Sequence, residues 1–202
     1  DSEVDTSITV GPMLDFIPPG SIPSGVKLLH LEKVDFTGFP PLRWPPRLPD
    51  DALAALLYTS GTSGRPKGVM LSHRNFQTNV EDSILHAGLT ADMTFLGVLP
   101  QFHSFVLTRL TLIPLAVGAK VVYSARFIPK KIVDLIHQHR PHVFMAVPSM
   151  YAALLSVKEL THDDVAAIRY PISGGEPLPR AVYDAFLNQL NFKILEGFGL
   201  TE

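Results

Sequence analysis

The chain has 202 residues, of which 46% are hydrophobic and 18% are charged, and its formal net charge is −2. This balance is that of a domain with a buried core and excludes a disordered chain. The lack of excess cations argues against a nucleic-acid partner, and the lack of cysteine excludes disulfides and thiolate metal sites. Since we recognise neither a signal peptide nor an apolar stretch long enough to span a bilayer, we expect a cytoplasmic protein without a membrane span.

Residues 1–50 contain half of the 18 prolines, several of them in pairs. Proline fixes φ and lacks a backbone donor, so we expect an irregular connecting segment with one strand near residues 26–31. From residue 51 onwards, short apolar runs alternate with segments of helical period, which is typical of parallel strands joined by crossover helices. We therefore predict an α/β domain with a mostly parallel β-sheet, in which residues 51–202 form the core and residues 1–50 are a Pro-rich connection.

The short apolar runs are the candidate strands, because strands buried on both faces lack polar alternation. They span residues 53–58, 94–99, 120–123, 142–147, 168–172 and 193–196. Ser72 is expected to cap a helix that stops at Gly88, and Pro129 to begin a second one. With further helices at residues 149–157 and 179–188, each strand is predicted to be followed by a helix. Such a sheet binds ligands beyond the carboxyl ends of its strands, so we expect the chemistry in the loops there.

A loop rich in glycine and hydroxyl groups follows the first of these runs, with the sequence YTSGTSGRPKG. Its backbone amides, hydroxyls and lysine are groups that bind a polyphosphate. The spacing excludes the P-loop of nucleoside triphosphatases, because Lys67 follows Pro66 and precedes Gly68. Judged by composition alone, a flexible Gly/Ser hairpin is the more common structure.

The order of residues in this loop resembles the signature of the adenylate-forming superfamily, (Y/F)TSGTTGxPKG(V/A). That superfamily includes acyl-CoA synthetases, acyl carrier protein synthetases, luciferases and peptide-synthetase adenylation domains. The one departure is a serine in place of the second threonine, which keeps the hydroxyl. The resemblance implies that the loop binds the β- and γ-phosphates of ATP and that Thr59 also contacts magnesium. The implied nucleotide ligands are Thr59, Ser60, Gly61, Thr62, Ser63, Gly64 and Lys67.

Three further segments resemble later motifs of the superfamily, in the same order. The first is LPQFHS at residues 99–104, similar to the LPxFH segment whose histidine lies beside the reacting carboxylate and whose aromatic residue shapes the acyl tunnel. This implies that Phe102 and His103 bind the acid. Taken alone, His103 would more often be a structural histidine, but its position after a strand favours the functional interpretation.

The other two segments are ordinary turns when each is taken alone. SGGEPLP at residues 173–179 resembles the loop whose backbone lies against the adenine, and EGFGLTE at residues 196–202 resembles (Q/E)GYGxTE. The implied nucleotide contacts are Gly174, Gly175, Glu176, Pro177, Glu196, Gly197, Phe198, Gly199 and Thr201. Phe198 replaces the usual tyrosine, which keeps the stacking ring but removes one hydrogen bond, at a cost of about 1 kcal/mol in affinity.

Four motifs in family order make chance a poor explanation, and they imply the large N-terminal domain of the adenylate-forming fold. The implied reaction is attack of a carboxylate on the α-phosphorus of ATP, with pyrophosphate leaving in line. Because two anions must meet, catalysis depends on positioning and on cations and hydrogen-bond donors. The catalytic candidates are Lys67, His103, Thr201 and Glu202, with Thr59 and Glu202 as Mg²⁺ ligands, since hard oxygen donors suit this cation.

The acyl group would then pass to a thiol, that of CoA or of an acyl carrier protein. We expect a fatty acid as substrate, because residues 102–115 look closest to the branch that activates fatty acids, although Val106 stands where that branch often has glycine. The ribose motif, the hinge and the mobile C-terminal domain of the family are missing, so we expect a piece of a larger enzyme that is inactive alone.

Three alternatives stay open at this point. The chain could come from an adenylation domain for an amino or aryl acid, or it could be a non-catalytic remnant that keeps the fold and nucleotide binding. It could also be a generic doubly wound domain whose Ser/Gly loop binds some other phosphate, which the ordered motifs disfavour.

Overall fold

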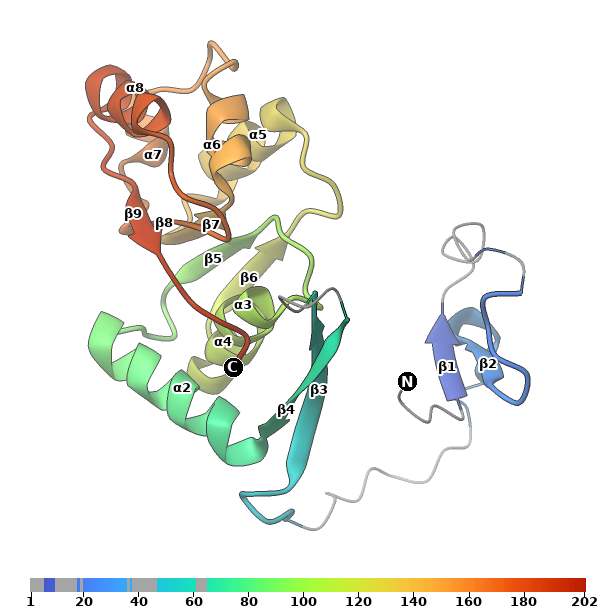
Figure 1. Ribbon diagram of the computed structural model, residues 1–202. Coiled ribbons are helices and arrows are strands. Elements are labelled where there is room, and N and C mark those ends of the chain that lie inside the picture. The colour runs from blue at the N-terminus through green and yellow to red at the C-terminus, as the bar shows by residue number, and fades with distance from the viewer. Residues whose placement is uncertain (1–5, 10–17, 19, 36, 38–46, 61–64) are drawn as a thin grey trace. The chain divides into compact units, whose positions relative to one another are not determined.

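The computed structural model describes residues 6–9, 18, 20–35, 37, 47–60 and 65–202 (Figure 1). The chain forms two compact units, residues 1–47 and 48–202. In the first unit, β1 (Thr6–Thr9) pairs in parallel with β2 (Lys27–His30), and the short helix η1 (Leu31–Lys33) follows. The strand predicted near residues 26–31 is therefore present. None of the described residues of this unit is buried. Among the described residues of the whole chain, no helix is long and apolar enough to cross a membrane.

A five-stranded sheet lies at the centre of the second unit, and all of its pairs are parallel. Its strands, in spatial order, are β6 (Lys120–Tyr123), β5 (Thr94–Gly97), β7 (Val143–Ala146), β8 (Tyr170–Gly174) and β9 (Leu195–Gly197). The predicted parallel sheet is thus confirmed, although β8 and β9 each begin two residues later than expected. All four residues of β7 are buried, as expected for a strand covered on both faces.

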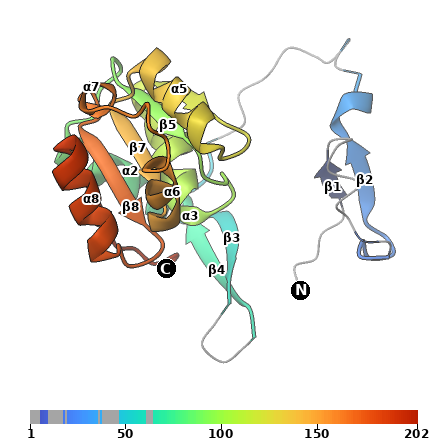
Figure 2. The same ribbon diagram turned by 90° about the horizontal axis from the view of Figure 1, so that it is seen from above.

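Helices cover both faces of this sheet (Figures 1 and 2). One face carries α2 (His73–Ala87), α3 (Ser104–Val106), η2 (Leu107–Leu112) and α4 (Ile113–Val117), whose buried residues Val80, Leu110 and Ile113 pack with Phe95. The other face carries α5 (Pro129–His139), α6 (Pro148–Leu154), α7 (His162–Val165) and α8 (Arg180–Leu190). A second core lies between these helices and the sheet, so β5 and β7 contribute to both cores.

The helix signals in the sequence act as expected. Ser72 accepts a hydrogen bond from the backbone of Asn75 in a capping box at the start of α2, and Gly88 ends this helix in the left-handed conformation. Pro129 occupies the first turn of α5. A long helix that the sequence patterns did not predict runs through α3, η2 and α4 to Gly118, with a π-helical segment of six residues in η2.

One prediction is wrong. Residues 53–58 do not join the parallel sheet, because β3 (Leu53–Thr59) pairs antiparallel with β4 (Lys67–Ser72) in a separate two-stranded sheet. The rule that each strand is followed by a helix therefore fails here. Side chains along β3 alternate between exposed and half-buried, as in a ribbon with one solvated face. The sequence hides this alternation because the exposed positions Leu56 and Tyr58 are apolar as well.

Candidate active site

A cavity of about 510 Å³ lies where the hairpin meets the segments that follow β5 and β9 in the chain. Its walls come from three segments that are far apart in sequence. The lining residues are Leu57, Tyr58, Thr59 and Ser60 of the hairpin, Phe102, His103 and Ser104 after β5, and Thr201 after β9. Five of these, Thr59, Ser60, Phe102, His103 and Thr201, are residues that the sequence motifs single out.

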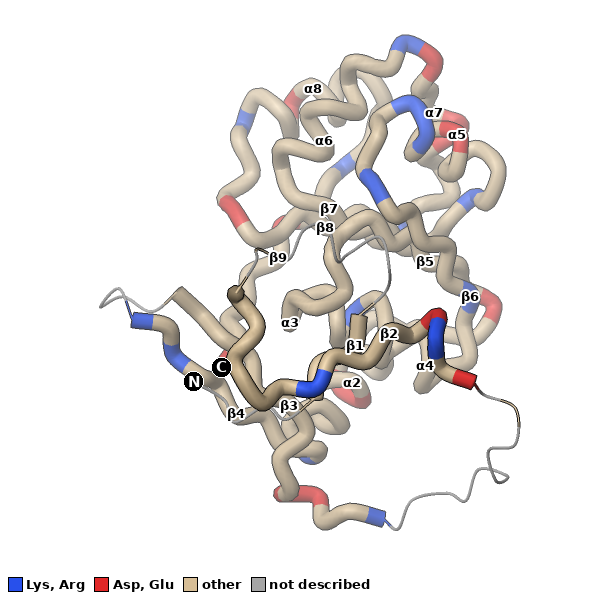
Figure 3. The backbone as a smooth tube through the Cα atoms, turned by 90° about the vertical axis from the view of Figure 1, so that its right-hand side faces the viewer, with Lys and Arg blue, Asp and Glu red and all other residues tan. Residues whose placement is uncertain are grey.

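The hairpin brings the first of these groups to the cavity. Thr59, the last residue of β3, is paired directly with Lys67, the first residue of β4, so the cation stands opposite the hydroxyl across the ribbon. Figure 3 shows cationic segments at this end of the hairpin. The predicted ligands Gly61, Thr62, Ser63 and Gly64 lie outside the described residues.

His103 ends the connection from β5 and is the N-cap of α3. Its Nδ1 accepts a hydrogen bond of 3.3 Å from the backbone N–H of Phe105. A neutral imidazole that accepts at Nδ1 carries its proton at Nε2. His103 can therefore donate from Nε2 to an anionic group in the cavity. The neighbouring ring of Phe102 is 82% exposed and lines the same cavity.

The two glycine-rich segments of the C-terminal half lie side by side. Gly174 of β8 is paired with Gly197 of β9, and a Cβ added at Gly174 would lie 3.2 Å from the Gly197 carbonyl oxygen and 3.3 Å from Cζ of Phe105. Gly175 has a φ of 85°, a backbone conformation that residues with a side chain rarely adopt. Close packing therefore favours glycine at position 174, and the backbone conformation favours it at position 175.

The loop after β8 is also held by a side chain from β9. Glu196 accepts a hydrogen bond of 2.9 Å from the backbone N–H of Leu178, at the end of the SGGEPLP segment. This contact gives Glu196 a visible structural role beside the nucleotide contact that the motif implies. Neither Glu196 nor the loop residues Gly174, Gly175, Glu176 and Pro177 line the cavity.

The residues of the EGFGLTE segment differ in how closely they approach the cavity. The Oγ1 of Thr201 lies 3.2 Å from the Oγ of Ser104, which joins the LPQFHS and EGFGLTE segments. The ring of Phe198 is 91% exposed, and Glu202 is exposed, so neither is enclosed by the described residues. Lys67, Gly197, Phe198, Gly199 and Glu202 are outside the set that lines the cavity.

The composition of the lining fits an anion that carries oxygens. Besides Ser104, four residues that carry a hydroxyl group line the cavity together with His103, namely Tyr58, Thr59, Ser60 and Thr201. Among the described residues there is no group of three or more His, Cys, Asp or Glu that could hold a metal ion by itself. In complexes with phosphates, Mg²⁺ usually takes one or two carboxylates from the protein and its other ligands from phosphate oxygens and water.

Sequence reasoning did not single out Ser104, Leu57 and Tyr58. Ser104 ends the LPQFHS segment, so its position next to His103 was the available signal. Leu57 and Tyr58 belong to a run that the sequence presents as a buried strand, whereas the structure places this run in the hairpin, where both residues line the cavity.

The chain matches the AMP-binding enzyme family over residues 18–202, and it belongs to this family. It is 31% identical over 194 residues to a long-chain-fatty-acid–CoA ligase of Bacillus subtilis, covering 94% of this chain and 33% of the relative. It is 36% identical over 159 residues to 4-coumarate–CoA ligase 1 of Oryza sativa subsp. japonica, covering 76% of this chain and 28% of the relative. Among solved structures, ATP-bound MatB from Rhodopseudomonas palustris superposes with a TM-score of 0.71 at 35% identity, covering 77% of this chain and 30% of that one.

These similarities identify the homologues as acyl-CoA ligases and the fold as that of adenylate-forming ligases. The chain spans about a third of the length of the relatives it matches. Within the described part of the chain, the segments that match the family motifs at Thr59, His103 and Thr201 meet around one cavity.

Proposed function

We propose that the protein uses ATP to convert a carboxylic acid into an acyl adenylate and pyrophosphate, and then transfers the acyl group to the thiol of CoA. The observation that carries this proposal is the cavity, which is lined by hydroxyl-bearing residues of the hairpin and of the EGFGLTE segment and by a histidine that can donate a hydrogen bond from Nε2. Membership of the AMP-binding family and similarity to CoA ligases support the same reaction.

The residues divide into a phosphate set and a carboxylate set. Thr59, Ser60 and Lys67 on the hairpin would hold the β- and γ-phosphates, and Thr201 would donate to an α-phosphate oxygen. His103 would orient the substrate carboxylate by donating from Nε2. The carboxylate oxygen then attacks the α-phosphorus while the bond to pyrophosphate breaks, and no covalent bond to the enzyme is needed.

A magnesium ion suits this set of donors. The Thr59 hydroxyl and the Glu202 carboxylate are hard oxygen ligands, and they would share the cation with phosphate oxygens. When bound, Mg²⁺ would neutralise the charge of the triphosphate. The adenine would lie against the Gly174–Pro177 loop, with the exposed ring of Phe198 available for stacking.

For the acid, we propose a fatty acid as the first candidate and an aryl acid as the second. The fatty acid is supported by the similarity to a long-chain-fatty-acid–CoA ligase over 94% of the chain. The aryl acid is supported by the higher identity, over a shorter stretch, to 4-coumarate–CoA ligase 1. CoA is the proposed acceptor because both relatives are CoA ligases, and an acyl carrier protein is the alternative.

The test is acid-dependent exchange of pyrophosphate into ATP by the full-length protein. Palmitate, a short-chain acid, 4-coumarate and mixed amino acids are supplied separately, with and without magnesium. We expect exchange with palmitate, and we expect Lys67→Ala to lower it by about 100-fold, which is typical for the loss of a group that stabilises transition-state charge.

Arg65→Ala is the matched control, because Arg65 is a cation of the same connection that the family signature leaves variable. It should keep exchange within about threefold of the wild type, as expected for an exposed charge. Exchange with 4-coumarate alone would move the assignment to aryl acids. A protein that binds Mg·ATP but exchanges with none of the acids would instead be a non-catalytic member of the family.

A further inference from the structure

We infer that Ser104 is a positioning residue that holds the Thr201 hydroxyl in the orientation needed to donate to the phosphate. This inference rests on the proposed function. It starts from one contact, the 3.2 Å separation of Ser104 Oγ and Thr201 Oγ1, which joins residues 97 positions apart in the chain. Both residues line the same cavity and both are partly buried.

The two partners differ in how they are held. Thr201 lies in the segment after β9, outside any helix or strand. Ser104 is the first residue of α3, directly after its N-cap His103, and α3 and the η2 segment that continues it place Val106 and Leu110 in the core with 2% and 0% exposure. Ser104 is therefore the fixed partner, and the hydrogen bond restrains the threonine.

The direction of the hydrogen bond follows from the proton count of a hydroxyl, which carries one proton and two lone pairs. If Thr201 donates its proton to a phosphate oxygen, it can only accept from Ser104. Ser104 must then be the donor, which gives the chain Ser104 O–H to Thr201 O–H to phosphate. In such a chain each hydrogen bond polarises the next one, so the effect is largest when charge on the phosphate is greatest.

This role makes a kinetic prediction that simple anchoring of the segment does not make. A contact that strengthens as charge develops in the transition state affects kcat, whereas a contact that only shapes the binding site affects KM. Ser104→Ala should therefore lower kcat for acid-dependent exchange by about tenfold, the size of one hydrogen bond to a charged system. The KM for ATP should change by less than about threefold.

The experiment measures kcat and KM for ATP in the full-length wild type, Ser104→Ala, Ser104→Thr, Thr201→Ala and the double variant Ser104→Ala/Thr201→Ala. Ser104→Thr keeps the hydroxyl and should recover most of the lost kcat. In the double variant, the Ser104 change should add no further loss to that of Thr201→Ala, because Ser104 acts through Thr201.

Ser156→Ala is the matched control, since Ser156 also donates its hydroxyl to a neighbouring group, the Ala153 carbonyl, at the end of a helix on the other face of the sheet. The inference is overturned if Ser104→Ala behaves like Ser156→Ala, if it raises KM at unchanged kcat, or if its effect multiplies with that of Thr201→Ala. Absence of exchange in the wild type with every acid is a different outcome, which overturns the proposed function and the inference with it.

Discussion

The hairpin β3–β4 and the five-stranded sheet both supply residues to the cavity, but they are packed in opposite ways. Every side chain of β7 is buried, whereas no residue of β3 or β4 is fully buried. Figures 1 and 2 show the hairpin outside the sheet and its helical layers. The candidates for binding the β- and γ-phosphates thus stand on a ribbon whose side chains are exposed or half-buried, whereas His103, Thr201 and the glycine-rich segments follow strands of a buried sheet. We expect substitutions in the scaffold to lower stability, and substitutions in the ribbon to lower activity with little loss of stability.

The largest effect on stability is expected in the scaffold. Phe144→Ala should lower the free energy of unfolding by about 4 kcal/mol, because it leaves a cavity in the core. Phe144 is 1% exposed, and its ring packs edge-on against Tyr151 at a centroid distance of 5.4 Å. Urea unfolding followed by circular dichroism measures the change. A loss below about 2 kcal/mol would mean that the site collapses easily and that the contrast with the hairpin is weaker than the burial indicates.

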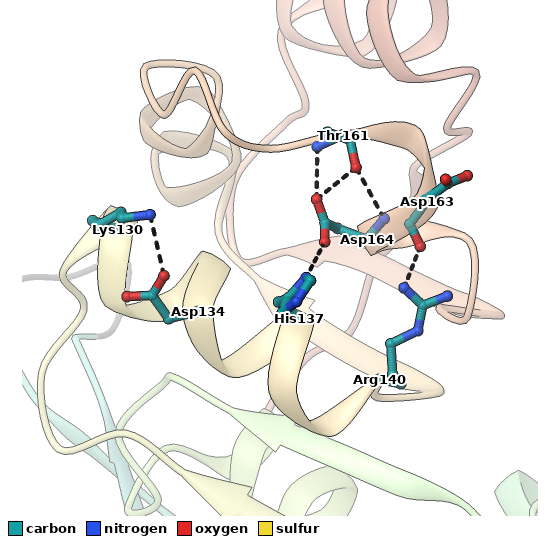
Figure 4. A network of polar contacts seen from close by, with 7 residues as sticks. All are labelled: Lys130, Asp134, His137, Arg140, Thr161, Asp163 and Asp164. Carbon is teal, nitrogen blue, oxygen red and sulfur yellow. Dashed lines mark hydrogen bonds and ion pairs between the residues drawn. The ribbon is translucent and has the colours of Figure 1, made fainter.

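A smaller effect is expected in the helical layer of the scaffold, at the buried carboxylate of Asp164 (Figure 4). Asp164 accepts hydrogen bonds from the backbone and hydroxyl of Thr161, in a capping box, and contacts His137 of α5 at 2.8 Å. Asp164→Ala should lower the free energy of unfolding, measured by urea unfolding, by about 2 kcal/mol, since it removes the N3 side chain of the capping box and an interhelical contact together. Asp163→Ala, at the exposed neighbouring position, is the control and should stay within about 0.5 kcal/mol of the wild type.

The same carboxylate gives a pH dependence with a definite sign. Burial of Asp164 opposes ionisation, but hydrogen bonds from Thr161 and His137 outweigh it and lower its pKa below the ordinary value of 3.8. A group with a lowered pKa stabilises the fold above its unfolded pKa, and the contribution is lost as the pH falls through the folded pKa. The stability difference between the wild type and Asp164→Asn should therefore shrink as the pH falls below about 4. An unchanged difference at pH 3 would exclude this linkage.

The smallest effect is expected on the outer face of the hairpin. Met70 is 73% exposed and is paired with Leu56 on the solvated side of the ribbon. Met70→Ala should change the free energy of unfolding by less than about 0.5 kcal/mol. The measurement is again urea unfolding, under the conditions used for Phe144→Ala. A loss above about 1.5 kcal/mol would break the comparison, because it would show that this face is packed against other chain in solution.

The sequence allowed the scaffold to be predicted but not the hairpin. Five apolar runs identify the parallel strands because burial on both faces demands continuous apolar residues, and Gly88 and Pro129 mark helix ends through backbone chemistry that acts locally. The pairing of β3 with β4 depends instead on residues that are separated in the chain by the connecting loop. A two-stranded ribbon is usually recognised by alternation of apolar and polar residues, and here Leu56 and Met70 on the exposed face of the hairpin are apolar, so this alternation is absent from the sequence.

The candidate site was likewise predictable only in part. Motif order pointed to Thr59, His103 and Thr201, which the structure places around one cavity, and their roles stay predictions. The contact between Ser104 and Thr201 could not be read from the sequence, because it joins two segments through the packing of a helix that no pattern indicated.

The π-helical segment η2 changes the rotational phase of the long helix that runs through α3, η2 and α4. A π-helical turn accommodates an additional residue relative to an α-helical turn, and here the segment lies between Ser104 at the cavity and Ile113 in the core. One residue corresponds to about 100° of rotation around a helix axis. We expect that deleting one residue from Leu107–Leu112 would let η2 become a regular α-helix while the buried residues before and after it keep their directions. A residue inserted between Ser104 and Val106 would instead rotate Ser104 by about 100° relative to the buried residues that follow it, and so turn it away from Thr201.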